Sequence, residues 1–166
     1  MAESIRILVV DDEAPFTAAL RERLELRGFE VATAPGGAEA LELCVDDKFD
    51  LALVDLKMPG MDGKELLSRL KAAHGFLEVI ILTGHGSLGS AVECAKLGAF
   101  SYLPKPYELE ELLVVLRDAY AERLRRKFAA LEAAQQQRLQ KLMEAVQHES
   151  PLGILRRMRE LDDGRR

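Results

Sequence analysis

The chain has 166 residues, of which 48% are hydrophobic and 31% are charged, and its formal net charge is −5. This length allows one domain with its own core plus an appendage, but not two full domains. No stretch approaches the roughly 20 apolar residues of a membrane span. The first residues, Met1–Ser4, lack the basic and apolar regions of a signal peptide. We therefore expect a cytoplasmic protein without a membrane partner.

Charge is divided unevenly along the chain. Residues 1–120 contain 21 acidic and 12 basic side chains, net −9, whereas residues 121–166 contain 7 acidic and 11 basic ones, net +4. Nucleic acid binding depends on clustered Lys and Arg, so we expect no direct nucleic acid binding by this chain. Cys44 and Cys94 have no CxxC partner and no His at metal spacing, which predicts buried, reduced thiols.

Short apolar runs alternate with helical patterns from the N-terminus to about residue 120, as in chains that form a parallel α/β sheet. Strands are predicted at residues 5–10, 30–34, 51–55, 78–83 and 100–103. Helices are predicted at residues 15–27, 37–47, 63–75, 88–97 and about 108–147. Asp62 and Ser87 are the expected N-caps of the third and fourth helices. The predicted fold class is α/β, a doubly wound sheet of five parallel strands with an extended C-terminal helix.

Three carboxylates stand where predicted strands end. Asp11 and Asp12 follow the first apolar run, and Asp55 follows the third. In an open α/β sheet, ligands bind beyond the carboxyl ends of the strands, so these acids should share one pocket. Crowded carboxylates need a cation, and oxygen ligands suit Mg²⁺. Thr83 and Lys105 end two further strands and would add a hydroxyl and an ammonium to the same site.

Five short motifs resemble, in family order, the receiver domain of bacterial two-component response regulators. They are Val10-Asp11-Asp12-Glu13, the run from Asp55 to Gly63, Leu82-Thr83-Gly84, Gly98-Ala99 and Lys105-Pro106. The resemblance covers about residues 4–120. It implies a flavodoxin-like sheet with strand order 2-1-3-4-5.

The same resemblance implies roles for individual residues. Asp55 is the expected phosphoacceptor. Asp12 and Asp55 should hold Mg²⁺ together with the main-chain carbonyl of Lys57, and Asp11 should act on the metal directly or through water. Lys105 should reach the phosphoryl group as a point charge, ahead of a Lys105–Pro106 bond expected to be cis. Thr83 resembles the family's catalytic and switch hydroxyl, and Tyr102 its switch aromatic.

Simpler interpretations remain open at several of these positions. Asp11 and Asp12 could cap the following helix, Lys105 could be a solvated surface lysine, and Tyr102 could be an ordinary half-buried ring. The three histidines, His74, His85 and His148, are isolated in sequence and predict neither a metal site nor a catalytic base.

The C-terminal third is expected to be a long helix outside the receiver. We divide the chain into a receiver at 1–120, a coiled-coil-like helical extension at 121–147, and a tail at 148–166. The extension carries an apolar stripe with an 11-residue repeat, which predicts a nearly straight or slightly right-handed supercoil. The stripe consists of Tyr120, Leu124, Phe128, Leu131, Gln135, Leu139, Leu142 and Val146.

A homodimer through this stripe is the favoured interpretation, because a lone helix gains too little to stay ordered in water. The stripe could instead fold back on its own domain or dock another protein. After Ser150-Pro151, residues 152–161 could form a short helix, but a fraying end is the favoured expectation.

The favoured function is a phosphorylation-activated receiver of a two-component phosphorelay, accepting a phosphoryl group on Asp55 from a histidine kinase or phosphotransfer protein. Such a protein is an enzyme only for its own Mg²⁺-dependent phosphorylation and dephosphorylation. One alternative is the receiver and linker of a longer DNA-binding or ATPase regulator. Another is a haloacid-type phosphatase, which would need a second Asp where this chain has Lys57.

Overall fold

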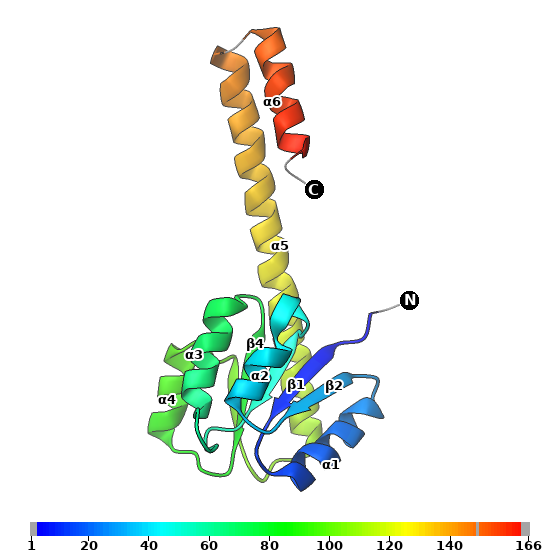
Figure 1. Cartoon of the computed structure of the whole chain (residues 1–166), viewed down its shortest axis with the longest axis vertical. Helices are drawn as coiled ribbons and strands as arrows, with labels where there is room; N and C mark the ends of the chain where they lie inside the picture. Colours follow the sequence, from blue (N-terminus) through cyan, green and yellow to red (C-terminus); the bar gives the residue numbers. More distant parts are fainter. Residues whose placement is uncertain (1–2, 149, 164–166) are drawn as a thin grey trace. The chain divides into compact units, whose positions relative to one another are not determined.

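The computed structural model describes residues 3–148 and 150–163 and confirms the predicted α/β class. Its elements are β1 (Arg6–Val10), α1 (Ala14–Glu25), β2 (Glu30–Ala34), α2 (Gly37–Leu43), the 3₁₀ turn η1 (Val45–Asp47), β3 (Leu51–Val54), α3 (Gly63–Ala73), β4 (Glu78–Thr83), α4 (Leu88–Lys96), β5 (Ser101–Pro104), α5 (Leu109–His148) and α6 (Pro151–Asp163). The strands form one parallel sheet in the expected order β2-β1-β3-β4-β5. Figure 1 shows the course of the chain through these elements.

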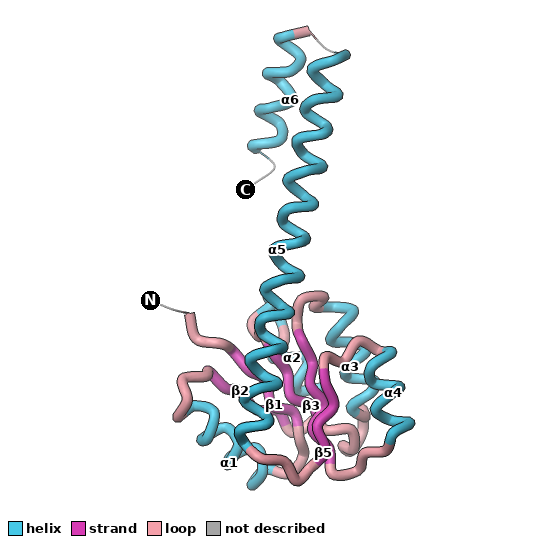
Figure 2. The backbone as a smooth tube through the Cα atoms, turned by 180° about the vertical axis from the view of Figure 1, so that it is seen from behind, coloured by secondary structure: helices cyan, strands magenta, loops and turns pink. Residues whose placement is uncertain are grey.

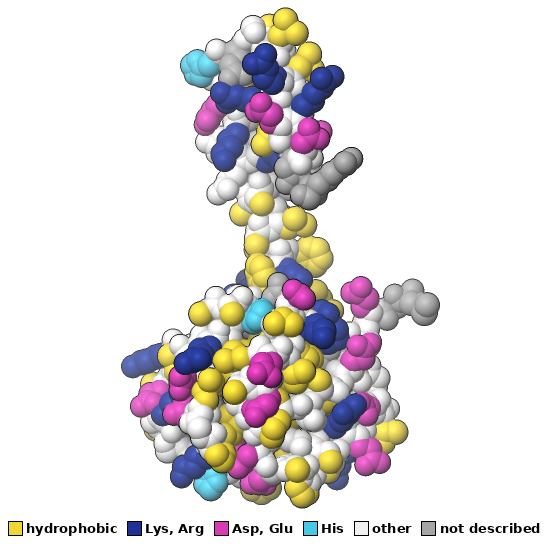
Figure 3. Space-filling view, viewed as in Figure 1, with side chains coloured by type: hydrophobic (Ala, Val, Ile, Leu, Met, Phe, Trp, Pro, Cys, Tyr) yellow, Lys and Arg dark blue, Asp and Glu magenta, His cyan; other side chains and the backbone are white. Residues whose placement is uncertain are grey.

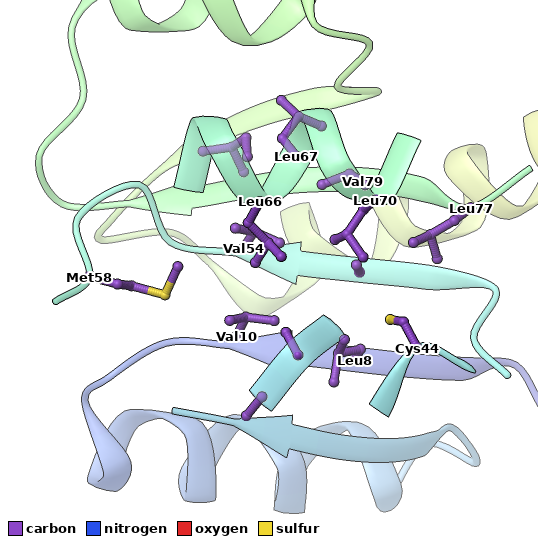
Figure 4. Packing of buried hydrophobic residues seen from close by; sticks show 14 of the residues in the cluster. Leu8, Val10, Cys44, Val54, Met58, Leu66, Leu67, Leu70, Leu77 and Val79 are labelled. Carbon is purple, nitrogen blue, oxygen red and sulfur yellow. The ribbon is translucent and has the colours of Figure 1, made fainter. Parts of the chain in front are cut away.

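Helices cover both faces of the sheet. Helices α2, α3 and α4 pack on one face, and α1 and the first part of α5 pack on the other (Figure 2). The strands supply both cores because successive side chains point to opposite faces: Leu8 and Val10 of β1 join the first core, and Ile7 and Val9 join the second. Leu66 points from α3 toward Val54 of the sheet (Figure 4).

The helix ends follow the local signals in the sequence. Asp62 caps α3 by accepting a hydrogen bond from Glu65 N at 2.8 Å, and Ser87 caps α4 by accepting one from Ser90 N at 3.1 Å. Gly28 follows α1 with a φ of +87°, a left-handed conformation that suits glycine. These caps confirm the predicted starts of α3 and α4.

Two boundaries differ from the sequence expectation. The second helix was expected to reach residue 47, but α2 ends at Leu43 and is followed by η1, in which Asp46 has a φ of +61°. Asp tolerates this left-handed conformation because its short side chain can bond locally. The favoured fraying end after Pro151 was also wrong, because α6 occupies this segment. Pro151 stands in its first turn, where its fixed φ and missing N–H suit a helix start.

The chain divides into two compact units between Leu124 and Arg125. In the second unit α6 lies beside the end of α5, and Arg138 of α5 contacts Asp162 of α6 at 2.8 Å and donates to Leu161 O at 3.3 Å. These contacts account for the ordered helix where a fraying end was expected. In the described part of the chain, no helix combines the length and apolarity that crossing a membrane would require.

Candidate functional site

The candidate site is a cleft of about 610 Å³ at the carboxyl ends of the strands. The strand register brings its residues together: Val10 of β1 pairs with Val54 of β3, so the acids that follow these two strands are neighbours. The lining is mostly polar and comprises Asp12, Glu13, Asp55, Leu56, Lys57, Met58, Pro59, Asp62, Lys64, His85 and Ser90.

The three predicted acids lie together, and two of them, Asp12 and Asp55, line the cleft. Asp11, Asp12 and Asp55 each place one carboxylate oxygen within 4.8 Å of the other two. Asp11 and Asp55 are buried, whereas Asp12 is exposed. Oxygen donors at this spacing fit a hard divalent cation such as Mg²⁺.

Asp55 has the most unusual environment of the three. Its Oδ1 is buried and has no hydrogen-bond partner in the described part of the chain. Burial raises the pKa of Asp55, and the Asp11 charge acts in the same direction, while Thr83 and Lys105 oppose the shift. A buried carboxylate oxygen without a partner is poised to accept a ligand.

Lys105 is held at the site by two contacts. Its Nζ lies 2.6 Å from Asp11 Oδ2 and 3.9 Å from the centre of the Phe16 ring. The sequence predicted the lysine but not its aromatic neighbour, because Phe16 looked like an ordinary apolar residue of the first helix. The Lys105–Pro106 bond is cis, as the resemblance implied.

The start of α3 packs directly against the end of β3. A Cβ atom on Gly63 would lie 2.2 Å from the Asp55 carbonyl oxygen, so no side chain fits at this position. The space between these backbones, rather than an unusual backbone angle, therefore accounts for the glycine. Lys57 and Met58, in the loop that this packing shapes, line the cleft.

Thr83 and Tyr102 lie on the neighbouring strands β4 and β5. Thr83 is fully buried, and its Oγ1 accepts a hydrogen bond from His85 N at 3.2 Å. Tyr102 is half-buried, and its Oη is inaccessible and interacts with the Ser87 backbone without forming a hydrogen bond of normal geometry. His85, to which the sequence gave no role, also lines the cleft.

The two cysteines are not among the residues that line the cleft. Cys44 and Cys94 are both buried and free, as predicted. Burial raises the pKa of Cys44 to about 11 and also raises the pKa of Cys94. Both thiols are therefore protonated and unreactive at neutral pH.

Curated relatives match the chain over its receiver-like part. The response regulator MprA of Mycobacterium ulcerans is 40% identical over 114 residues, which cover 69% of this chain and 49% of that protein. The DNA-binding transcriptional regulator NtrC of Escherichia coli is 40% identical over 113 residues, which cover 68% of this chain and 24% of that protein. The chain thus matches about half or less of the length of these relatives.

Solved structures share the fold. A CheY-like receiver domain protein of Methanospirillum hungatei has a TM-score of 0.72 and 32% identity, covering 75% of this chain and 99% of that one. NtrX of Brucella abortus has a TM-score of 0.72 and 31% identity, covering 78% of this chain and 30% of that one. The family model of the response regulator receiver domain matches residues 7–117. The chain therefore belongs to the receiver domain family of response regulators.

Proposed function

We propose that this receiver accepts a phosphoryl group on Asp55 from a histidine kinase or phosphotransfer protein and so acts in a two-component phosphorelay. The observation that carries the proposal is the buried, unpartnered Oδ1 of Asp55 at the end of a central strand, beside two further carboxylates. The homologous receivers in MprA and NtrC, both described as regulators, support the same function.

Asp55 would act as the nucleophile. One of its carboxylate oxygens forms the new O–P bond while the P–N bond of a phosphohistidine donor breaks and its electron pair stays on the imidazole nitrogen. Thr83 and Lys105 would then donate hydrogen bonds to phosphoryl oxygens. Lys105 Nζ is now bonded to Asp11, so it would share its charge between Asp11 and the phosphoryl group.

Asp11, Asp12, Asp55 and the main-chain carbonyl of Lys57 would hold Mg²⁺. The bound metal would neutralise negative charge on the phosphoryl oxygens. Asp11 has fewer free lone pairs than Asp12, because it already binds Lys105 Nζ and accepts from Glu13 N at 2.9 Å. Asp12 is therefore the more available direct ligand. In this role the protein is an enzyme only for its own phosphorylation and dephosphorylation, and we place it in the cytoplasm.

Labelling with a small phosphodonor tests the proposal. Acetyl phosphate with Mg²⁺ should add one phosphoryl group to the wild-type chain, measured by intact mass. Asp55→Ala should add none while remaining folded by circular dichroism. Asp46→Asn is the control, because Asn tolerates the left-handed conformation of this exposed residue, and its labelling should match wild type. Stoichiometric labelling of Asp55→Ala would contradict the assignment.

We further propose that the helical extension pairs two copies of the chain. Among residues 125–148 and 150–163, Ala145 is the one buried residue, so the α5–α6 hairpin has almost no core of its own. Eight large apolar side chains are exposed on it, among them Phe128, Leu131 and Leu152, and the other five form the surface proposed for pairing. These five are Leu139, Met143 and Val146 of α5 and Leu155 and Met158 of α6.

These five side chains lie on one side of the hairpin. A groove between the helices is lined by Lys141, Glu144 and His148 of α5 and by Arg157 and Glu160 of α6. At 3.6 residues per turn, the five apolar positions fall on the opposite side of each helix from these charged ones. Charged side chains are prominent on the hairpin in Figure 3. A second copy supplies an identical apolar side, which suits a twofold pairing.

A longer regulator is the second candidate. MprA and NtrC extend well beyond the matched region, and NtrC is a DNA-binding transcriptional regulator. In that case this chain is the receiver and linker, and an output domain follows it. The intact mass of the protein isolated from its own cells distinguishes the two, because only the longer regulator exceeds 18.5 kDa by the mass of a domain. In either case we propose that residues 1–166 do not bind DNA directly.

A further inference from the structure

We propose that Gly86 determines where the Tyr102 ring lies, and thereby controls the aromatic switch of this receiver. The inference rests on the proposed function in one respect, because it assigns the switch to Tyr102. Its geometric part depends only on the packing of the loop between β4 and α4 against β5.

The Tyr102 ring occupies the space that a side chain at residue 86 would need. A Cβ atom on Gly86 would lie 1.9 Å from Tyr102 Oη, 2.8 Å from Cζ and 3.0 Å from Cε1. All three atoms belong to the end of the Tyr102 side chain, so the ring is the part that must move. Any side chain at residue 86 therefore excludes the ring from its present place.

Space, and not backbone conformation, explains the glycine. The left-handed backbone that favours glycine occurs at Gly28, Gly60 and Gly98 but not at Gly86. An alanine could therefore adopt the Gly86 backbone, and the Tyr102 ring is the obstacle. Two other glycines near this loop have room for a Cβ: Gly84 would meet Lys105 Cβ at 4.0 Å, and Gly89 would meet Ser87 Oγ at 3.9 Å.

The loop connects this space to the phosphorylation site. Thr83 is buried at the end of β4, and its Oγ1 accepts a hydrogen bond from His85 N, the residue directly before Gly86. When Thr83 turns its hydroxyl to a phosphoryl oxygen, this hydrogen bond changes, and the position of Gly86 over the ring changes with it. The ring and the loop thus form one two-state element.

The inward position of the ring is only weakly held. Tyr102 Oη is buried, and its interaction with the Ser87 backbone falls short of a hydrogen bond of normal geometry, which is unfavourable for a hydroxyl. This cost offsets part of the stabilisation from packing the ring against the core, so a movement of the loop can change the populations of the inward and outward ring. A methyl group at residue 86 would shift them almost completely to the outward ring.

Nuclear magnetic resonance on the full chain with labelled tyrosines tests the inference, because the sequence has three Tyr and no Trp. Tyr102→Phe assigns the ring signal. A soluble paramagnetic agent should broaden the Tyr102 signal several-fold more in Gly86→Ala than in wild type. Gly89→Ala, the matched control, should leave it unchanged. If the paramagnetic agent broadens the Tyr102 signal no more in Gly86→Ala than in wild type, the proposal is overturned.

A thermodynamic cycle covers the case in which Gly86→Ala unfolds. Gly86→Ala should lower the urea midpoint in the wild-type background but have much less effect in a Tyr102→Ala background, where the ring is absent. Equal effects in both backgrounds would overturn the proposal.

Beryllofluoride with Mg²⁺, a mimic of the phosphoryl group, separates the two proposals. It should shift the Tyr102 signal in wild type and leave it outward in Gly86→Ala, while acetyl phosphate still labels Asp55 in both. If acetyl phosphate does not label Asp55 in wild type, the proposed function is refuted. If the Tyr102 ring is nevertheless outward in Gly86→Ala, the role of Gly86 still holds. If adding beryllofluoride to Gly86→Ala protects the Tyr102 signal from the paramagnetic agent, the ring has turned inward and the role of Gly86 is refuted.

Discussion

At the scale of single residues, the charge of Asp55 opposes folding. Burial raises the pKa of Asp55, so the folded chain favours the protonated form more than the unfolded chain does. The stabilising contribution of protonated Asp55 is therefore fully present below its ordinary pKa, and it is lost as the pH rises through its raised pKa in the folded chain. Asp55→Asn should have a higher urea midpoint than wild type at pH 7 without divalent metal, and this advantage should shrink on acidification. An advantage independent of pH would contradict the electrostatic explanation.

Mg²⁺ should offset the unfavourable burial of the Asp55 charge in the wild-type chain. A ligand at ten times its dissociation constant stabilises the folded state by about 1.4 kcal/mol. Thermal unfolding should show this increase for wild type and a much smaller one for Asp12→Asn at the same Mg²⁺ concentration. Asp12 is exposed, so its replacement leaves the fold intact. Glu13→Gln, also at the cleft, is the matched control and should respond as wild type does.

At the scale of elements, local sequence signals predicted most of the fold. Apolar runs located all five strands, and the capping residues Asp62 and Ser87 located two helix starts. These signals work because each depends on neighbours within a few residues. The end of α2 depends on the backbone of one residue, Asp46, and the formation of α6 depends on tertiary packing. The apolar pattern alone therefore misjudged both.

The site was predictable to the same degree and for the same reason. Asp11, Asp55 and Thr83 could be identified because each ends an apolar strand. The contacts of Lys105 with Phe16 and of Gly86 with Tyr102 could not, because they join residues far apart in the chain. Sequence spacing determines which residues reach the cleft but not how their side chains pair there.

The ionic anchor of α5 is a further element that only the structure reveals. Arg123 is buried, its Nε lies 3.1 Å from Asp50 Oδ1, and its Nη1 donates to Phe76 O at 2.7 Å. Asp50 directly precedes β3, and Phe76 lies between α3 and β4. The pair therefore ties the last receiver turn of α5 to the edge of the sheet opposite the cleft.

Removing this arginine should destabilise the receiver strongly. Arg123→Met leaves the buried Asp50 with one fewer cation, and breaking a buried pair typically costs about 3–5 kcal/mol. Arg6 also pairs with Asp50, so we expect the lower end of this range. Urea denaturation measures the change. Arg117→Met removes an exposed pair with Asp118 and should cost less than about 1 kcal/mol. Similar costs for the two variants would show that the anchor contributes little.

At the scale of the whole molecule, two copies of the hairpin could form a four-helix bundle. Leu139, Met143, Val146, Leu155 and Met158 are each about half exposed or more in one copy. Fully burying such a side chain contributes about 1.5–3 kcal/mol. Because each is already about half buried, ten of them across a dimer gain about half of that, about 8–15 kcal/mol, which is comparable to the roughly 4–15 kcal/mol lost on association. The proposed dimer surface differs from the apolar stripe predicted from the sequence. Leu142, a member of that stripe, lines the groove between α5 and α6 instead.

Light scattering on the intact chain should therefore give twice the monomer mass of 18.5 kDa at tens of micromolar. Leu139→Asp combined with Met143→Asp places two charges on the apolar side and should give a monomer with unchanged helix content. Ala134→Asp combined with Gln137→Asp adds the same charges on the opposite side of α5 and should remain dimeric. If the intact chain is monomeric with and without beryllofluoride, a second copy does not cover this side, and the hairpin is left to bind a different protein. If both double variants dissociate, added charge alone opposes pairing and the apolar side is not the interface.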